Sequence, residues 1–198
     1  RSMRVISVCC VSVGCQVELA HYNLCICCCW GSNFGAPEVF VSSLDVDVGF
    51  ALGHVAVARA LILCGHMPQA KASNSQAQDL SSKLNNRQRQ HIECFALLFS
   101  GQPHKARALV KRHVQDYPCD ALVAQLCSNV FGLIGFSGEV GREAELLAYT
   151  SELIHHYGDE RWMMSIHAIS WSETGQIAAS SSVMYTTLTC NARNQKGR

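Results

Sequence analysis

The sequence predicts an all-α fold in which antiparallel helical hairpins stack into a solenoid, preceded by an irregular N-terminal extension. From about residue 48 onward, apolar residues recur at intervals of three and four, which is the spacing of an amphipathic helix. Four glycines divide this region at regular distances, and each follows one apolar segment and precedes the next. Because 48% of the 198 residues are hydrophobic and 16% are charged, the chain can bury a sizeable core, which argues against intrinsic disorder.

The first three helices are delimited by residues that favour helix ends. The apolar spacing predicts one helix over residues 50–64. Pro68 begins a second helix, at a first-turn position where its missing N–H is not needed. Asn85 and Asn86 cap a third helix, which runs to residue 100, because asparagine side chains accept hydrogen bonds from free N–H groups at helix starts.

Four more helices follow. Pro103 begins the fourth, and Pro118 ends it. Asp120 caps a fifth helix, a sixth covers about residues 139–156, and Asp159 caps a seventh. The fifth helix is rich in apolar residues: Leu122, Val123, Leu126, Val130, Phe131 and Leu133. Short turns between consecutive helices make them antiparallel neighbours.

An internal repeat is the most informative feature. The four glycines are Gly65, Gly101, Gly135 and Gly175, spaced by 36, 34 and 40 residues. A period near 34 residues with a helix–turn–helix unit is typical of tetratricopeptide repeats. Glycine in these positions permits a turn with positive φ between two helices. The alternative is an ordinary helical bundle in which the glycines recur by accident.

Other positions keep the same phase as the glycines. Seven residues before them stand the small residues Ala58, Cys94, Ser128 and Ala168, and four residues before them the large residues Leu61, Leu97, Phe131 and Trp171. Small residues let the helices of a hairpin approach closely, and the large ones fill the adjacent space. We therefore expect a tetratricopeptide-like domain over residues 45–180, with units at about 48–84, 86–118, 120–157 and 159–185.

Several segments also carry a family resemblance. They are FALGHV at 50–55, NRQRQHIE at 86–93, YPCDALV at 117–123, VFGLIGFSG at 130–138, GREAELL at 141–147 and SETGQ at 172–176. Through them, about residues 45–176 resemble the tetratricopeptide repeat protein 38 family, and its bacterial members more than its animal ones. The resemblance implies a helical-repeat fold, later repeats beyond those seen here, and no catalytic residues to carry over.

The two ends of the chain do not share this resemblance. Seven of the twelve cysteines fall within the first thirty residues. Structural zinc sites use two well-spaced pairs of Cys or His, and the sequence has no second such pair, so we expect no metal site. The apolar run at 5–15 is too short to span a bilayer, so no membrane contact is expected. We interpret residues 1–44 as a Cys-rich extension that is poorly ordered or not authentic, and 186–198 as a disordered tail. The scattered cysteines elsewhere favour a reducing, cytoplasmic location.

Tests for chemistry give one weak candidate. The chain has no GxxxxGK[ST], GxGxxG, HExxH or GxSxG motif. His91 and Cys94 lie three residues apart on one helix, so a thiol- or metal-dependent enzyme or sensor, using them or the N-terminal cysteines, is the alternative function. A net charge of +1 gives no basic field for nucleic acid.

The preferred function is therefore a non-catalytic scaffold that binds a protein or peptide in a concave groove, without a cofactor. In stacked hairpins the first helix of each unit lines that side. By phase, the lining residues are Arg59, Gln88, His91, Phe95, Gln125, Asn129, Trp162 and Glu173. The last hairpin lacks a polar capping helix, so self-association through it is also expected.

Overall fold

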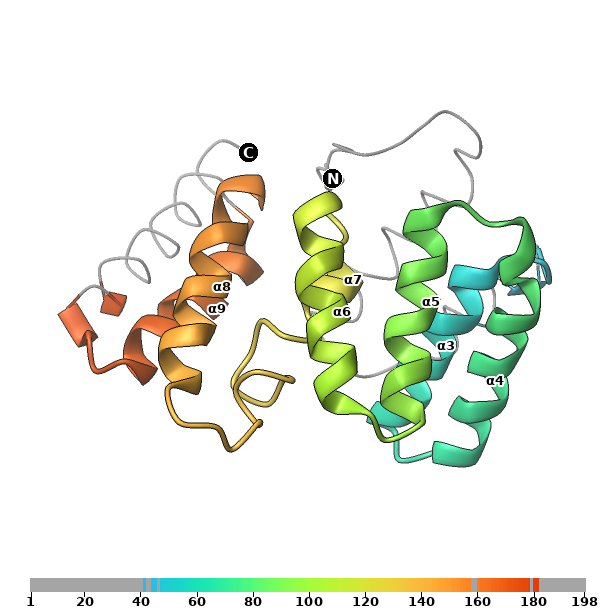
Figure 1. Ribbon diagram of the computed structural model, residues 1–198, viewed down its shortest axis with the longest axis horizontal. Helices are drawn as coiled ribbons and strands as arrows, with labels where there is room; N and C mark the ends of the chain where they lie inside the picture. Colours follow the sequence, from blue (N-terminus) through green and yellow to red (C-terminus); the bar gives the residue numbers. More distant parts are fainter. Residues whose placement is uncertain (1–40, 42–43, 46, 158–159, 179, 182–198) are drawn as a thin grey trace, which may run out of the picture. The chain divides into compact units, whose positions relative to one another are not determined.

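The computed structural model describes residues 41, 44–45, 47–157, 160–178 and 180–181 (Figure 1). Within these ranges the regular elements are helices and no strand occurs, which confirms the all-α prediction. The chain divides into two compact units, one ending at Leu109 and the other beginning at Val110. The predictions for residues 1–40 and 186–198 lie outside the described residues.

The first unit is built from a helical hairpin and the helix that follows it. Helices α3 (Ala51–Leu63) and α4 (Met67–Asp79) pack against each other, and the 3₁₀ helix η1 (Leu80–Lys83) leads to α5 (Asn86–Phe99). Helix α5 contacts both α4 and α3. The buried residues of this unit are mostly small and medium apolar side chains together with one phenylalanine, among them Val55, Ala58, Ala70, Ala77 and Phe95.

The start of α5 is fixed by its sequence. The Asn85 side chain accepts a hydrogen bond from the backbone N–H of Gln88 at 2.9 Å, and the Gln88 side chain accepts one from the N–H of Asn85 at 3.2 Å. This reciprocal pair is a capping box, which satisfies two N–H groups that a helix start leaves free. Asn85 is therefore the cap, and Asn86 is the first helical residue. Pro68 lies in the first turn of α4, as predicted.

Three of the four phased glycines end helices in the same way. Gly65, Gly101 and Gly175 have φ angles of 80°, 71° and 79°. The N–H of each glycine donates to the carbonyl of the residue three positions earlier. The N–H of the residue after the glycine donates to the carbonyl of the large residue that stands four positions before the glycine: Leu61 at 2.8 Å, Leu97 at 2.9 Å and Trp171 at 3.0 Å. These are Schellman motifs, which satisfy carbonyls at a helix end and need a residue with positive φ.

The next helix begins directly after each of these glycines. The carbonyl of the residue that follows the glycine accepts from the N–H of Ala70 at 3.0 Å, Ala106 at 3.0 Å and Ser180 at 3.1 Å. One residue thus closes the first helix and opens the second. The small positions predicted before these three turns agree with this geometry, because Ala58, Cys94 and Ala168 have 0% exposure. Ser128, which precedes Gly135, is also fully buried but lies outside the helices.

The second unit contains a further hairpin and a short helical turn. Helix α6 (Pro103–Asp116) crosses the boundary between the units and is followed by α7 (Ala121–Ala124). Helices α8 (Arg142–Tyr157) and α9 (Arg161–Glu173) pack together (Figure 1). The N-cap of α9 is Glu160, whose side chain makes no capping hydrogen bond; the predicted cap, Asp159, lies outside the described residues.

The predicted fifth helix is wrong in extent. Helix α7 covers four residues, and residues 125–141 form a series of turns, named here the glycine-rich loop. In this loop Gly138 and Gly141 have positive φ angles of 73° and 81°, whereas the predicted turn glycine, Gly135, does not. Gly135 has a different reason to be glycine: a Cβ there would lie 2.4 Å from the carbonyl oxygen of Val130. The backbone folds back on itself at this point, which a continuous helix would not do.

Asp120 stands at the N-cap position of α7, as predicted, but its side chain has another role. Its side chain makes no capping hydrogen bond to α7. Its Oδ2 instead lies 3.3 Å from Nε2 of His113, and both side chains are buried, at 1% and 0% exposure. The carboxylate therefore ties the end of α6 to the start of α7.

Candidate binding surfaces

The predicted groove residues of the first unit divide into open and buried ones. Arg59 on α3 and Gln88 on α5 are half-buried, and the Gln88 side chain is engaged in the capping box. His91 and Phe95 have exposures of 0% and 1%, and their rings stack with centroids 5.6 Å apart. Helix α5 packs against both α3 and α4, so more of its surface is covered than the positions of these residues in the repeat predict. His91 and Phe95 are therefore core residues and not groove residues.

The predicted groove residues of the second unit have mixed positions. Gln125 is buried, at 7% exposure. Asn129 is half-buried: its Oδ1 accepts from the N–H of Phe131 at 2.9 Å, and its Nδ2 donates to the carbonyl of Gln125 at 3.3 Å. These two residues shape the start of the glycine-rich loop. Trp162 is half-buried and Glu173 is exposed, so both are available at the surface of α9.

The glycine-rich loop presents two aromatic side chains to solvent. Phe131 and Phe136 are 82% and 75% exposed, and their ring centroids lie 6.5 Å apart. Val140, in the same loop, is fully exposed. The helical spacing placed Phe131 in the core of a fifth helix, so this pair was missed. The available signal was the density of glycine, at positions 132, 135, 138 and 141, which is unfavourable for a helix.

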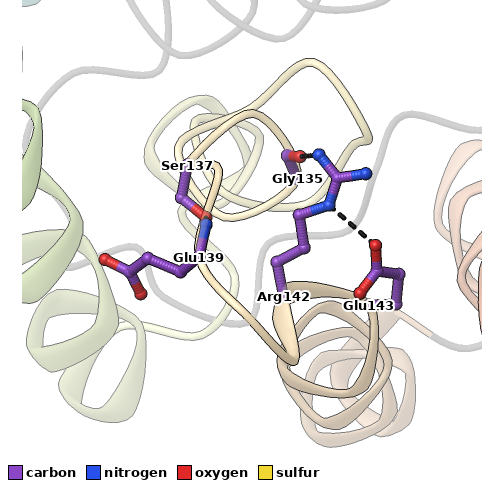
Figure 2. Close-up of polar contacts among 5 residues, drawn as sticks. All are labelled: Gly135, Ser137, Glu139, Arg142 and Glu143. Carbon is purple, nitrogen blue, oxygen red and sulfur yellow. Dashed lines mark hydrogen bonds and ion pairs between the residues drawn. The ribbon is translucent and has the colours of Figure 1, made fainter.

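A set of polar contacts holds this loop in place. Arg142 Nη1 donates to the carbonyl of Gly135 at 3.0 Å, and its Nε donates to Oε1 of Glu143 at 2.7 Å (Figure 2). The hydrogen bond between their side chains raises the pKa of the Arg142 guanidinium and lowers that of the Glu143 carboxyl. Figure 2 also shows Ser137, whose Oγ accepts from the N–H of Glu139 at 3.3 Å.

The backbone of the loop adds further bonds. The N–H of Leu133 donates to the carbonyl of Leu126 at 2.8 Å, and that of Gly132 donates to the carbonyl of Asn129 at 2.8 Å. The buried hydroxyl of Tyr149 on α8 donates to the carbonyl of Ala124, the last residue of α7, at 3.0 Å. The two phenylalanines therefore stand on a framework fixed by internal hydrogen bonds.

A buried polar chain links α8 and α9. The indole N–H of Trp171 donates to Nε2 of His167 at 3.0 Å, so this ring nitrogen is an acceptor and the imidazole is neutral. Its Nδ1 then carries the proton and donates to Oγ1 of Thr150, at 3.0 Å. The Thr150 hydroxyl donates onward to the carbonyl of Leu146, also at 3.0 Å. Burial, and secondarily the charge of His155, lowers the pKa of His167, which agrees with this assignment.

The residues of the alternative enzyme function are placed only in part. Both His91 and Cys94 have 0% exposure, so the Cys94 thiol lies in the core and is closed to a substrate in this conformation. Among the described residues, no group of three or more His, Cys, Asp or Glu side chains could hold a metal ion. The N-terminal cysteines lie outside those residues. Within the same part of the chain, no helix is both long enough and apolar enough to cross a bilayer.

The fold and these surfaces define a protein of helical hairpins that carries candidate binding residues on its surface. No protein-family model and no curated protein matches the chain, so the resemblance to the tetratricopeptide repeat protein 38 family stays a prediction. Among solved structures, the chain is similar to a crystal structure described as "YrrB: a TPR protein with an unusual peptide-binding site". The TM-score is 0.46 at 11% identity, over 86% of this chain and 84% of that one.

Proposed function

We propose that the protein is a non-catalytic helical-repeat scaffold that binds a segment of another protein. The stacking in the first unit is the observation that carries this proposal. Helix α5 contacts α3 as well as α4, so the first helices of successive hairpins are neighbours. In helical-repeat proteins this arrangement lines up first helices along a concave binding side.

Arg59 and Gln88 are the residues of this side that we propose for the first unit. They lie on α3 and α5, and both keep part of their surface open. Arginine is enriched among residues that dominate protein interfaces, because its planar guanidinium combines hydrogen bonds with apolar contact. On the second unit, Trp162 and Glu173 of α9 have comparable access and are proposed as contact residues there.

Peptide selection tests the proposal directly. A random peptide library would be panned against the immobilised full chain, and selected peptides would be titrated by calorimetry. We expect a 1:1 complex that Arg59→Ala weakens about tenfold, since truncating an interface arginine commonly costs more than about 1 kcal/mol. Lys71→Ala is the matched control, because Lys71 is an exposed cation on α4, the second helix of the same hairpin.

Two results would contradict the proposal. One is that no selected peptide binds stoichiometrically. The other is that Arg59→Ala and Lys71→Ala bind equally well while circular dichroism shows both variants folded. Zinc bound in stoichiometric amount by the purified chain would instead favour the metal-dependent alternative.

We also propose self-association through the last hairpin and a cytoplasmic location. Ile169 on α9 and Ile177 beyond it are 39% and 69% exposed, which leaves apolar surface available to a second copy. Sedimentation velocity on the chain with Ile177→Ser would show whether association is lost. The location is supported by Cys64, Cys94, Cys119 and Cys127, which are free thiols, because a reducing compartment preserves such thiols.

A further inference from the structure

We propose that His167 is a proton-operated switch, which holds the indole ring of Trp171 when the imidazole is neutral and releases that ring when the imidazole takes up a proton. This inference goes beyond the proposed function, because it concerns the control of one part of α9 and needs no binding partner to be tested. It rests on the directions of the hydrogen bonds at the two nitrogens of one buried imidazole.

Both ring nitrogens of His167 are engaged, and each hydrogen bond has one possible direction. The indole N–H of Trp171 can only donate, so Nε2 of His167, 3.0 Å away, is the acceptor. The Thr150 hydroxyl donates to the carbonyls of Leu146 and Leu147, at 3.0 and 3.1 Å. Its oxygen therefore accepts from Nδ1 of His167 at 3.0 Å. The ring proton is held on Nδ1, and the bond to Trp171 depends on the lone pair of Nε2.

A second proton on the imidazole breaks only one of these two bonds. It is taken up at Nε2, since Nδ1 already carries a hydrogen. The lone pair that accepts from Trp171 is then replaced by an N–H, so two donors face each other across 3.0 Å. The bond to Thr150 is unchanged, because Nδ1 donates in both charge states. The indole ring must therefore move away, whereas the imidazole stays on Thr150.

The surroundings of His167 favour the neutral ring. The side chain is 7% exposed. Burial removes water from the imidazole and lowers its pKa, and the positive charge of His155 on α8 lowers the pKa further. The holding state is therefore the state at neutral pH, and release belongs to mildly acidic conditions.

The other titratable groups of this hairpin include no buried carboxylate that could balance a charge on His167. Helix α8 packs against α9, and the titratable residues among its buried ones are Tyr149 and Tyr157. The remaining charged residues of α9, Arg161 and Glu173, are its first and last residues. The sequence that follows, residues 174–182, contains no charged residue.

Trp171 lies where its release changes the surface of α9. It is half-buried, and its ring centroid lies 5.9 Å from that of His167 with the rings at 72°. Part of the indole already meets solvent, so the ring can move outward without passing through the core. The carbonyl of Trp171 accepts from the N–H of Gln176 and from the hydroxyl of Thr174, and these bonds do not involve the indole. Release therefore moves one aromatic side chain and leaves the turn that ends α9 intact.

Nuclear magnetic resonance of the indole N–H groups measures the switch directly. The full chain has three tryptophans, and labelling them with nitrogen-15 gives one indole signal for each. Trp171→Phe identifies the signal of Trp171. As the pH is lowered from about 8 to about 5, we expect this signal to shift in one step with a midpoint below about 6.5, the ordinary pKa of histidine. Far-UV circular dichroism should stay constant across the step.

Three substitutions assign the step to one imidazole. His167→Gln should abolish the shift, because glutamine keeps an acceptor for the indole N–H and does not titrate. His155→Gln should move the midpoint to higher pH, because it removes a positive charge that disfavours protonation of His167. His156→Gln is the matched control and should leave the midpoint unchanged, since His156 is an exposed histidine at the next position of α8.

Two outcomes would overturn the inference. If the Trp171 signal keeps its position over this pH range, or shifts equally in the His167→Gln variant, then His167 does not control the indole ring. If the helical circular dichroism is lost in the same step, the proton unfolds the hairpin and does not release a single side chain.

Discussion

Replacing Gly135 by alanine tests the conformation of the glycine-rich loop. The added Cβ would lie 2.4 Å from the carbonyl oxygen of Val130 and 2.6 Å from its Cα. Real Cβ atoms do not approach a backbone this closely, and a backbone cannot turn away as a flexible side chain can. The loop must therefore shift, and the hydrogen bond from Arg142 to the carbonyl of Gly135 shifts with it.

The expected loss of stability combines these two effects. Overpacking of a fixed site costs about 1–3 kcal/mol. A disturbed hydrogen bond adds about 1 kcal/mol. We therefore expect the free energy of unfolding of Gly135→Ala to fall by about 2–4 kcal/mol, measured by urea unfolding and followed by circular dichroism.

Gly138 provides the control, because it is glycine for another reason. A Cβ at Gly138 would meet no described atom within 4 Å, but its φ of 73° is unfavourable for most residues. Gly138→Ala should cost about 1–2 kcal/mol. Gly138→Asn should cost less, because asparagine tolerates positive φ. At Gly135 the order should be reversed, with asparagine at least as damaging as alanine, because volume and not φ is the constraint.

The sign of the Gly135→Ala effect separates two conformations. If the segment were the continuous helix that its apolar spacing suggests, alanine would stabilise it by about 1 kcal/mol relative to glycine. A stable or stabilised Gly135→Ala variant would therefore refute the close approach of Gly135 and Val130. It would also contradict the exposed position of Phe131.

Three further predictions concern the helices. The pKa of His167 is lower in the folded chain than in the unfolded chain, so the unfolded chain takes up the proton first as the pH falls. The stability that this group contributes is therefore complete above about pH 6.5 and is lost below it. His167→Gln should reduce the fall of the free energy of unfolding with decreasing pH, measured by urea unfolding at several pH values. Ala106→Leu should cost about 1–3 kcal/mol because Ala106 is fully buried on α6, whereas Ala108→Leu, at an exposed position on the same helix, should be nearly neutral in thermal unfolding. Asn85→Ala should cost about 1 kcal/mol through loss of the capping box, and an equal effect of Asn86→Ala would contradict the assignment of the cap.

The hairpin turns could be predicted from the sequence because their chemistry is local. A Schellman motif needs a residue with positive φ, and glycine adopts such angles without a steric cost. The residue type at Gly65, Gly101 and Gly175 is therefore enough to predict a turn at each position. The small residues before them, such as Ala58 and Ala168, could also be placed because their buried positions recur at a fixed distance from the turn.

The glycine-rich loop could not be predicted because its conformation depends on tertiary contacts. The spacing of Leu122, Leu126 and Val130 is helical, and nothing local says that Gly135 will pack on Val130. The contact from Arg142 to the Gly135 carbonyl is likewise a feature of the folded loop. Only the high density of glycine in this segment indicates that a helix is unfavourable.

The candidate site was predicted in part for a similar reason. Phase identifies which residues share a helix face, but the width of the buried stripe depends on how many helices cover that face. Because α5 contacts both α3 and α4, His91 and Phe95 became core while Arg59 stayed partly open. Asn129 and Gln125 were assigned to a helix that does not extend to them, so their role in shaping the loop was outside what periodicity can reveal.

The three-residue turns between the helices also restrict how the length of the chain can change. The residue after Gly65 both completes the Schellman motif of α3 and serves as the N-cap of α4. One inserted residue at this point would rotate the following helix by about 100°, because an α-helix has about 3.6 residues per turn. Ala70 would then leave the buried face and a polar neighbour would enter it. Surface turns usually accept insertions and deletions readily. At Gly65, Gly101 and Gly175, however, the turn length determines which side chains of the next helix face the core.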